Sequence, residues 1–250
     1  MAISDEIKEQ TVKLKDMNRK QKAEYIWTYY KWWIIIALFV IIFISSTIKS
    51  VIRNSRPVYL NVMFLNSVAS ASIKPCTLES DFAAEYGIDT NVYDMAFDYV
   101  TYLDNNYGNQ ASMAGQVKLT SMYQAEELDI VCGPESTLTG SGDVGGYYKL
   151  DELLSKEKLN ELEKKGYTPF YYTEKIYDDD AMPDAEGNIP YTDGETYLAG
   201  FCIDNCKMLM EQGDKGIYTK IEGDPIYLTV AFNAKNLEHA VEFIDFITKK

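Results

Sequence analysis

The sequence contains very few of the residues on which most enzymatic and nucleic-acid chemistry depends. It has one histidine, His239, and no arginine beyond residue 56. Because His239 is the only histidine, a Ser-His-Asp triad away from His239 is excluded, and no G-x-S-x-G motif occurs. Without arginine, the residues from 57 onward lack the usual bidentate clamp for phosphate or carboxylate. We therefore expect no catalytic residues, no cofactor and no enzyme activity.

Metal-binding patterns are also missing. The pair Cys202 and Cys206 has neither a second pair nor a histidine nearby, as a zinc site would need. The acidic run over 178–193 does not have the spacing of an EF-hand loop, and two solvated hairpin turns explain it better. We expect no metal site. A hydrolase that uses two carboxylates stays as an alternative, although nothing in the sequence singles out one pair of acidic residues.

The four cysteines leave the redox state open. Cys76, Cys132, Cys202 and Cys206 all follow residue 57. An even number permits disulfides outside the cell, but the sequence does not choose among three pairings. His239 falls on the side of the expected final helix that faces away from its apolar stripe, which predicts a surface histidine.

Charge is divided unevenly along the chain. The net charge is −14, yet residues 1–56 carry ten basic and five acidic residues. Residues 57–250 carry 14 lysines against 33 acids. Such an acidic segment repels nucleic acid and anionic membrane surfaces, so we expect no nucleic-acid partner.

One long apolar run, Trp32–Ile48, separates these two parts. Counted from Tyr29, it has about the 20 residues that a helix needs to cross a bilayer, and aromatic residues crowd its first end. A cleaved signal peptide would have a shorter leader and a small-x-small site after the core. A buried core helix would rarely be this long without polar residues. We interpret 29–48 as a transmembrane signal anchor in contact with membrane lipid through Trp32–Ile48.

Basic residues near the run set the expected orientation. More lysines and arginines precede the run than follow it, which favours a cytoplasmic N-terminus. We expect a cytoplasmic basic amphipathic helix over 1–28, a tether over 49–56 and an extracellular domain over 57–250. The localisation follows: a single-pass protein of the cell membrane with its C-terminal domain outside.

Alternating strand and helix patterns predict an α/β domain. Strands are expected over 58–65, 92–103, 129–133, 169–176, 196–204 and 226–232. Helices are expected over 4–25, 77–86, 113–127, 150–165, 206–212 and 237–248, and an irregular Gly- and Ser-rich loop over 135–146. In the helix over 113–127, Met113, Val117 and Met122 lie near one apolar face. The order strand, helix, strand predicts a parallel sheet.

Three stretches carry a family resemblance: 118–157, with an Asp-Ile-Val strand and a Leu-Asp-Glu helix; 184–205; and 226–247. As a set they resemble type 2 periplasmic-type (extracellular) solute-binding proteins. The aromatic run over 25–33 is similar to uncharacterised single-pass proteins of Gram-positive, Clostridia-like bacteria. The resemblance implies a shortened, two-lobed solute-binding domain. It also implies binding of a small solute (a sugar, peptide or amino acid) in an interlobe cleft, for transport or sensing.

Candidate ligand-binding residues follow from the position of binding sites in open α/β sheets, beyond the carboxyl ends of the strands. Those positions hold Asn66, Ser67, Gly133, Glu135 and Ser136. Three tyrosines could offer stacking faces: Tyr147, Tyr191 and Tyr197. The alternative is a non-catalytic adaptor that holds a membrane-protein partner through a degenerate binding fold. The identity of the ligand, the partner and the oligomeric state stay open.

Overall fold

The computed structural model describes residues 18–68, 76–104, 109–177, 182, 189–210, 216–220 and 222–249. The chain divides into two compact units, 1–56 and 57–250, and each is described by itself. Most of the helix predicted over 4–25 and most of the acidic hairpin predicted over 178–193 lie outside the described residues.

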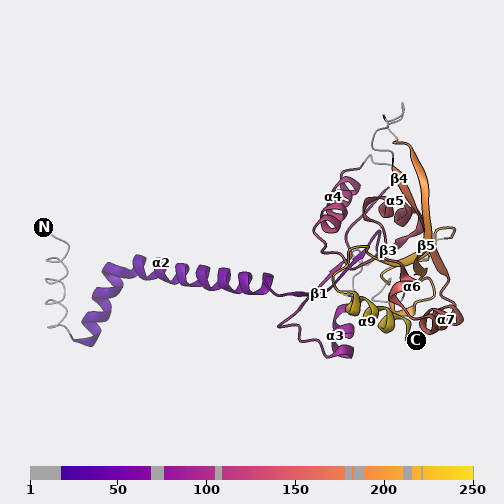
Figure 1. Ribbon diagram of the computed structural model, residues 1–250. Coiled ribbons are helices and arrows are strands. Elements are labelled where there is room, and N and C mark those ends of the chain that lie inside the picture. The colour runs from indigo at the N-terminus through magenta and orange to yellow at the C-terminus, as the bar shows by residue number, and fades with distance from the viewer. Residues whose placement is uncertain are drawn as a thin grey trace. The chain divides into compact units, whose positions relative to one another are not determined.

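The first unit contains one long helix, α2 (Arg19–Asn54), of 36 residues (Figure 1). It begins with a capping box in which Asn18 and Gln21 exchange side-chain and backbone hydrogen bonds. Within it, Tyr30–Val51 is long and apolar enough to cross a membrane. The helix continues through most of the predicted tether. The reason is that no proline or glycine occurs before Pro57.

The second unit is built on a six-stranded mixed sheet with the order β2-β1-β3-β6-β5-β4. The strands are β1 (Val58–Phe64), β2 (Asp94–Asp98), β3 (Ile130–Pro134), β4 (Pro169–Tyr177), β5 (Tyr191–Cys202) and β6 (Ile226–Val230). β1 pairs in parallel with both β2 and β3, as the strand-helix-strand pattern predicted. β6, β5 and β4 continue the sheet through antiparallel pairings. The α/β class is therefore confirmed.

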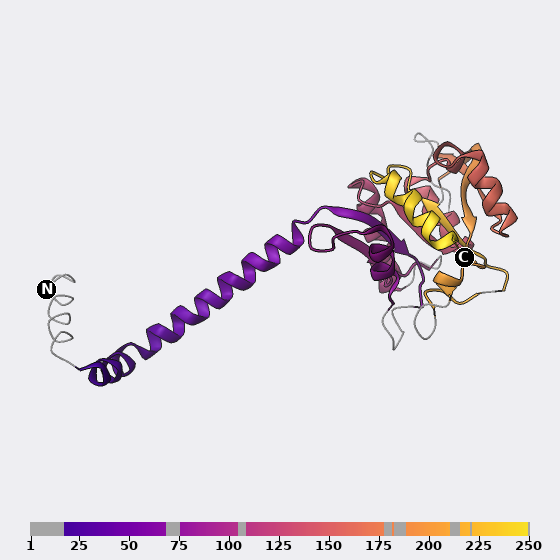
Figure 2. The same cartoon turned by 90° about the horizontal axis from the view of Figure 1, so that it is seen from below.

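Helices cover both faces of this sheet (Figures 1 and 2). The helices are α3 (Leu78–Tyr86), α4 (Gln110–Gln124), α5 (Glu135–Gly145), α6 (Leu150–Leu153), α7 (Lys156–Lys164), α8 (Lys207–Met210) and α9 (Leu237–Thr248). One core gathers side chains from α3, α6, α7, α8 and α9, and the other gathers them from α4 and α5. β1 supplies both cores by strict alternation: Val62 and Phe64 face the first, and Met63 faces the second.

Two predictions about helices were wrong. The predicted loop over 135–146 forms α5, because burial of Thr137 and Leu138 outweighs the poor helix propensity of its glycines. In α4, Met113 and Val117 are 61% and 67% exposed, so the apolar face was misplaced. The buried face instead contains Gly115, where an added Cβ would come within 2.3 Å of the Tyr102 carbonyl oxygen. Glycine lets the helix approach that backbone closely.

The helix predicted over 150–165 is broken in two. α6 ends at Leu153, and α7 starts after Ser155, whose hydroxyl accepts a hydrogen bond from the Lys158 amide. The break lets Leu150, Leu154 and Leu162 all enter the first core. Residues 57–250 form one compact unit around one sheet, and the predicted division into two lobes is not confirmed.

Candidate functional site

The predicted residues at the carboxyl end of β1 bind the protein's own backbone. The Asn66 side chain accepts a hydrogen bond from the Leu103 amide and donates to the Leu103 carbonyl and the Thr137 hydroxyl. Its φ of 57° is in the left-handed region, which asparagine tolerates better than most residues. The Ser67 hydroxyl donates to the Ile217 carbonyl. Both side chains therefore hold neighbouring loops in place.

The predicted residues at the carboxyl end of β3, Gly133, Glu135 and Ser136, also contact other parts of the protein. Gly133 is buried, and a Cβ at this position would lie 3.1 Å from the Leu65 Cβ. At Glu135, the first residue of α5, the backbone amide donates to the Pro225 carbonyl. Ser136 donates from its amide and its hydroxyl to the two carboxylate oxygens of Asp224.

Two of the three predicted tyrosines come together, and the third lies apart from them. Tyr147 and Tyr197 are buried and joined, since the Tyr197 hydroxyl donates to the Tyr147 carbonyl at 2.9 Å. The Tyr147 hydroxyl donates to the Leu138 carbonyl. Tyr191 lies at the opposite end of β5 from the first core, exposed, with the Lys175 ammonium 5.1 Å from its ring centre. Of the eight predicted residues, Tyr197 lines the cavity described next.

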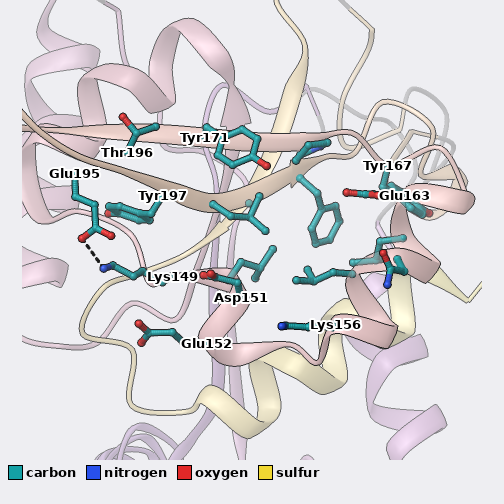
Figure 3. A pocket seen from close by; sticks show the side chains of 18 residues that line it. Lys149, Asp151, Glu152, Lys156, Glu163, Tyr167, Tyr171, Glu195, Thr196 and Tyr197 are labelled. Atoms are coloured by element: carbon teal, nitrogen blue, oxygen red, sulfur yellow. Dashed lines mark hydrogen bonds and ion pairs between the residues drawn. The ribbon is translucent and has the colours of Figure 1, made fainter.

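A cavity of about 550 Å³ lies between the helices α6 and α7 and the strands β4 and β5 (Figure 3). It lies over the outer, antiparallel half of the sheet, away from the parallel strands on which the sequence-based prediction was centred. Eighteen residues line it: Lys149, Leu150, Asp151, Glu152, Lys156, Leu159, Asn160, Leu162, Glu163, Tyr167, Pro169, Tyr171, Glu195, Thr196, Tyr197, Leu198, Gly200 and Phe201.

The local sequence explains this hollow. Leu150, Leu154 and Leu162 anchor α6 and α7 to the first core, so the polar faces of both short helices turn toward solvent. On β4, alternate residues Phe170 and Tyr172 enter the second core. Pro169 and Tyr171 therefore face the other side, and Tyr171 is 61% exposed. The helices and this strand face border the cavity, which is partly open to solvent.

The apolar wall of the cavity comes from both sides. Leu159 and Leu162 belong to α7, whereas Leu198 and Phe201 belong to β5. Gly200 lies between these two strand residues, where a Cβ would come within 2.0 Å of the Leu228 carbonyl oxygen. Glycine is needed here because β5 and β6 approach closely.

Charged groups surround this apolar wall. Lys149 and Glu195 form an ion pair of 2.7 Å, and the Lys149 ammonium lies 5.6 Å from the Tyr197 ring centre. The hydrogen bond that Lys149 donates to the Glu195 carboxylate raises the pKa of Lys149. Four other charged residues of the lining have no ion pair among the described residues: Asp151, Glu152, Lys156 and Glu163.

One polar group inside the cavity is nearly enclosed. Tyr167, which follows α7, is 3% exposed and packs edge-on against Phe201 at a ring-centre distance of 5.6 Å. Burial raises its pKa to about 12, and the Cys206 thiol adds to the rise. Its hydroxyl makes no hydrogen bond with another residue that the structure describes. A bound molecule could therefore bond to it.

The remaining reactive side chains lie elsewhere. All four cysteines are free, and burial raises the pKa of the Cys132 thiol and raises that of Cys206 to about 11, which disfavours the thiolate. His239 is half-buried rather than on the open surface, stacked on Tyr59 at 3.6 Å between ring centres. Its Nδ1 donates to the Tyr59 carbonyl oxygen at 2.7 Å. Among the described residues, no three His, Cys, Asp or Glu side chains could hold a metal ion.

Sequence reasoning missed every cavity residue except Tyr197. The stretch over 150–165 was interpreted as one charged helix, so its charges were assigned to a solvated face. Ser155, a good N-cap residue in the middle of that stretch, is the signal that could have indicated two helices and a concave surface. Comparisons with protein-family models, with curated proteins and with solved structures find no match for this chain.

Proposed function

We propose that this chain is a single-pass, membrane-anchored recognition protein that binds a small solute in the cavity between α6, α7, β4 and β5. In this proposal the N-terminus is cytoplasmic and the domain over 57–250 is a shortened, two-lobed domain of the solute-binding type outside the cell. The observation that carries the proposal is the cavity of about 550 Å³. Solute capture would serve transport or sensing and involves no catalytic step.

The composition of the cavity supports binding. Small-molecule sites commonly enclose about 300–1,000 Å³ and combine apolar and aromatic walls with a few polar groups that orient the ligand. Here Leu159, Leu198 and Phe201 provide the apolar wall, and Tyr171 exposes an aromatic face. The hydroxyl of Tyr167 and the side chains around the rim provide the polar groups.

The anchor supports the placement at a membrane. Tyr30–Val51 spans 22 residues, enough to cross roughly 30 Å of hydrocarbon at 1.5 Å per residue. More lysines and arginines precede Trp32 than lie in the residues just after Ile48, which fits an N-terminus inside and a domain outside. A helix retained after insertion would hold the cavity close to the cell surface.

A melting experiment tests the binding proposal. The full chain in mild detergent is screened against amino acids, amines, short peptides and sugars, because a ligand that binds the folded state raises the melting temperature. At a concentration 100 times the Kd, the expected stabilisation is about 2.7 kcal/mol. Tyr171→Ala should abolish the shift. Tyr177→Ala, on the same strand but outside the cavity, should preserve it. No shift across all classes would contradict solute binding.

The adaptor alternative is favoured by a different observation. In the part of the chain that the structure describes, β4 is the outer strand of the sheet and pairs with β5 alone. Ile176 and Tyr177 are exposed near its end, beside the exposed Tyr191 of β5. Outer strands with exposed apolar side chains are frequent contact points for other proteins. Crosslinking in native membranes should then yield a heteromeric product that Ile176→Lys reduces, and a lone monomer would argue against the adaptor role.

A further inference from the structure

The lining of the cavity has an unequal charge balance. It contains four carboxylates, from Asp151, Glu152, Glu163 and Glu195, and two ammonium groups, from Lys149 and Lys156. The ion pair between Lys149 and Glu195 removes one charge of each sign from this balance. Three carboxylates and one ammonium group then face a bound molecule.

The Tyr167 hydroxyl adds a second, independent requirement. This side chain is 3% exposed, lines the cavity and makes no hydrogen bond with another described residue. Among the described residues, the fully buried side-chain polar atoms without a partner are the Tyr99 and Tyr123 hydroxyls and the Asn233 Oδ1, so the Tyr167 hydroxyl still touches solvent. A ligand that supplies a hydrogen-bonding group here would replace water at this hydroxyl. Figure 3 shows Tyr167 at the α7 end of the cavity and Asp151 at the α6 end.

We infer that the ligand of this cavity is a small organic cation: a primary ammonium group on an apolar or aromatic body that also carries a hydrogen-bonding group. This inference rests on the proposed function and specifies its ligand class. The ammonium group lies near the carboxylates of Asp151 and Glu152 at the α6 end, whereas Glu163 lies beside Tyr167 (Figure 3). The body packs between Leu159 and Leu198, over the exposed Tyr171 ring. The hydrogen-bonding group reaches the Tyr167 hydroxyl.

Anionic ligands fit this cavity poorly. An anion could pair with Lys156, the one lysine of the lining without an ion pair among the described residues, but carboxylates lie at both ends of the cavity, Asp151 and Glu152 at one and Glu163 at the other. No arginine is available in the whole of 57–250 to form a bidentate contact with a carboxylate or phosphate. Repulsion between like charges can exclude the wrong ligand, just as attraction between unlike charges can select the right one.

Three tyrosine derivatives with the same body test the inference. Tyrosinamide is a cation at neutral pH, N-acetyltyrosinamide is neutral, and N-acetyltyrosine is an anion. Isothermal titration of each into the full chain in mild detergent, at low and at high salt, separates the effect of charge from that of the body. Tyrosinamide should bind at least about tenfold more tightly than the neutral amide, and salt should weaken its binding. N-acetyltyrosine should not bind measurably.

Variants locate the binding energy. Asp151→Asn combined with Glu152→Gln should weaken tyrosinamide binding roughly tenfold. Glu157→Gln, on α7 but outside the cavity lining, should leave the affinity unchanged and controls for the general negative charge of the domain. Tyr167→Phe should weaken the binding of both tyrosinamide and N-acetyltyrosinamide without reducing the preference for the cation.

The outcomes separate the two proposals. If N-acetyltyrosine binds as tightly as tyrosinamide and Tyr171→Ala abolishes both, the cavity binds solutes and the inferred ligand class is wrong. If Asp151→Asn/Glu152→Gln and Glu157→Gln lower the tyrosinamide affinity equally, the cation is attracted by the whole acidic surface and the inference also fails. If neither these three compounds nor the broad screen produces any binding, the proposed function itself is contradicted.

Discussion

Replacing Asp129 with alanine should destabilise the 57–250 domain by about 3 to 5 kcal/mol. Asp129 directly precedes β3 and is 1% exposed, with no lysine or arginine paired to it in the described structure. Its carboxylate accepts hydrogen bonds from the amide of Asn61 in β1 at 2.9 Å and from the amide and side chain of Asn236 at 3.0 Å each. This one side chain therefore joins the central strands to the start of α9.

The magnitude follows from those three donors. Each buried donor left without a partner costs about 1 to 3 kcal/mol, and the contributions of neighbours are not fully additive. Asp129→Asn should cost less, about 2 to 3 kcal/mol, because one oxygen remains while its new NH₂ group faces a donor. Both losses are large beside the 5 to 15 kcal/mol that typically stabilise a domain.

Urea unfolding of the full chain in mild detergent measures these losses. Near-ultraviolet circular dichroism of the tyrosines reports on the domain, because all three tryptophans lie at 27, 32 and 33. Asp224→Ala is a matched control, since Asp224 bonds to Ser136 at the surface and should cost about 1 kcal/mol. A loss for Asp129→Ala no larger than that of the control would refute the reasoning that the buried carboxylate joins β1 to α9.

Three further predictions concern acid stability, packing and the anchor. Burial acts to raise the pKa of Asp98, but hydrogen bonds from Lys118 and Thr101 outweigh it and lower the pKa overall. Asp98 thus stabilises the fold above its unfolded pKa of about 3.9, and this contribution is lost as the pH falls through the lower folded pKa. The melting temperature of the Asp98→Asn variant should therefore fall less steeply with decreasing pH in the acid range than that of the unmodified protein. Gly200→Ala should cost more than about 3 kcal/mol in urea unfolding, whereas Gly194→Ala, whose nearest atom is 3.1 Å away on a side chain, should cost less. Phe39→Lys combined with Ile42→Lys should raise the free energy of membrane insertion by roughly 5 to 7 kcal/mol, so carbonate extraction should release the variant chain from the membrane. Unchanged retention in the membrane would contradict the anchor.

The elements that the sequence predicted well are those whose local signals agree with their tertiary role. β1 follows Pro57 with a run of β-branched and aromatic residues, and the structure starts it at Val58. α3 ends where Gly87 adopts a φ of 64°, as a helix-terminating glycine should. α9 matches its predicted bounds, because its apolar stripe has the helical period over its whole length.

Tertiary contacts decided the elements that were mispredicted. Nothing local indicates that Met113 and Val117 are exposed, since the buried face of α4 is chosen by Gly115 approaching the Tyr102 carbonyl. The helix α5 forms in a Gly- and Ser-rich stretch because Leu138 is enclosed by the second core. In both cases long-range packing outweighs local propensity.

The position of the cavity could not be derived from the sheet rule used to predict the site. That rule places ligands at the carboxyl ends of parallel strands, and the chain has parallel pairing only among β1, β2 and β3 in the described sheet. There Asn66 bonds to Leu103 and Thr137, and the Tyr218 hydroxyl bonds to the carbonyls of Leu65 and Cys132. These groups are already satisfied within the protein, so a ligand would have to displace them. The unsatisfied groups, the free carboxylates and the exposed Tyr171 ring, lie instead over the antiparallel half. Binding energy is available where polar groups lack partners, which makes the cavity between α6, α7, β4 and β5 the stronger candidate.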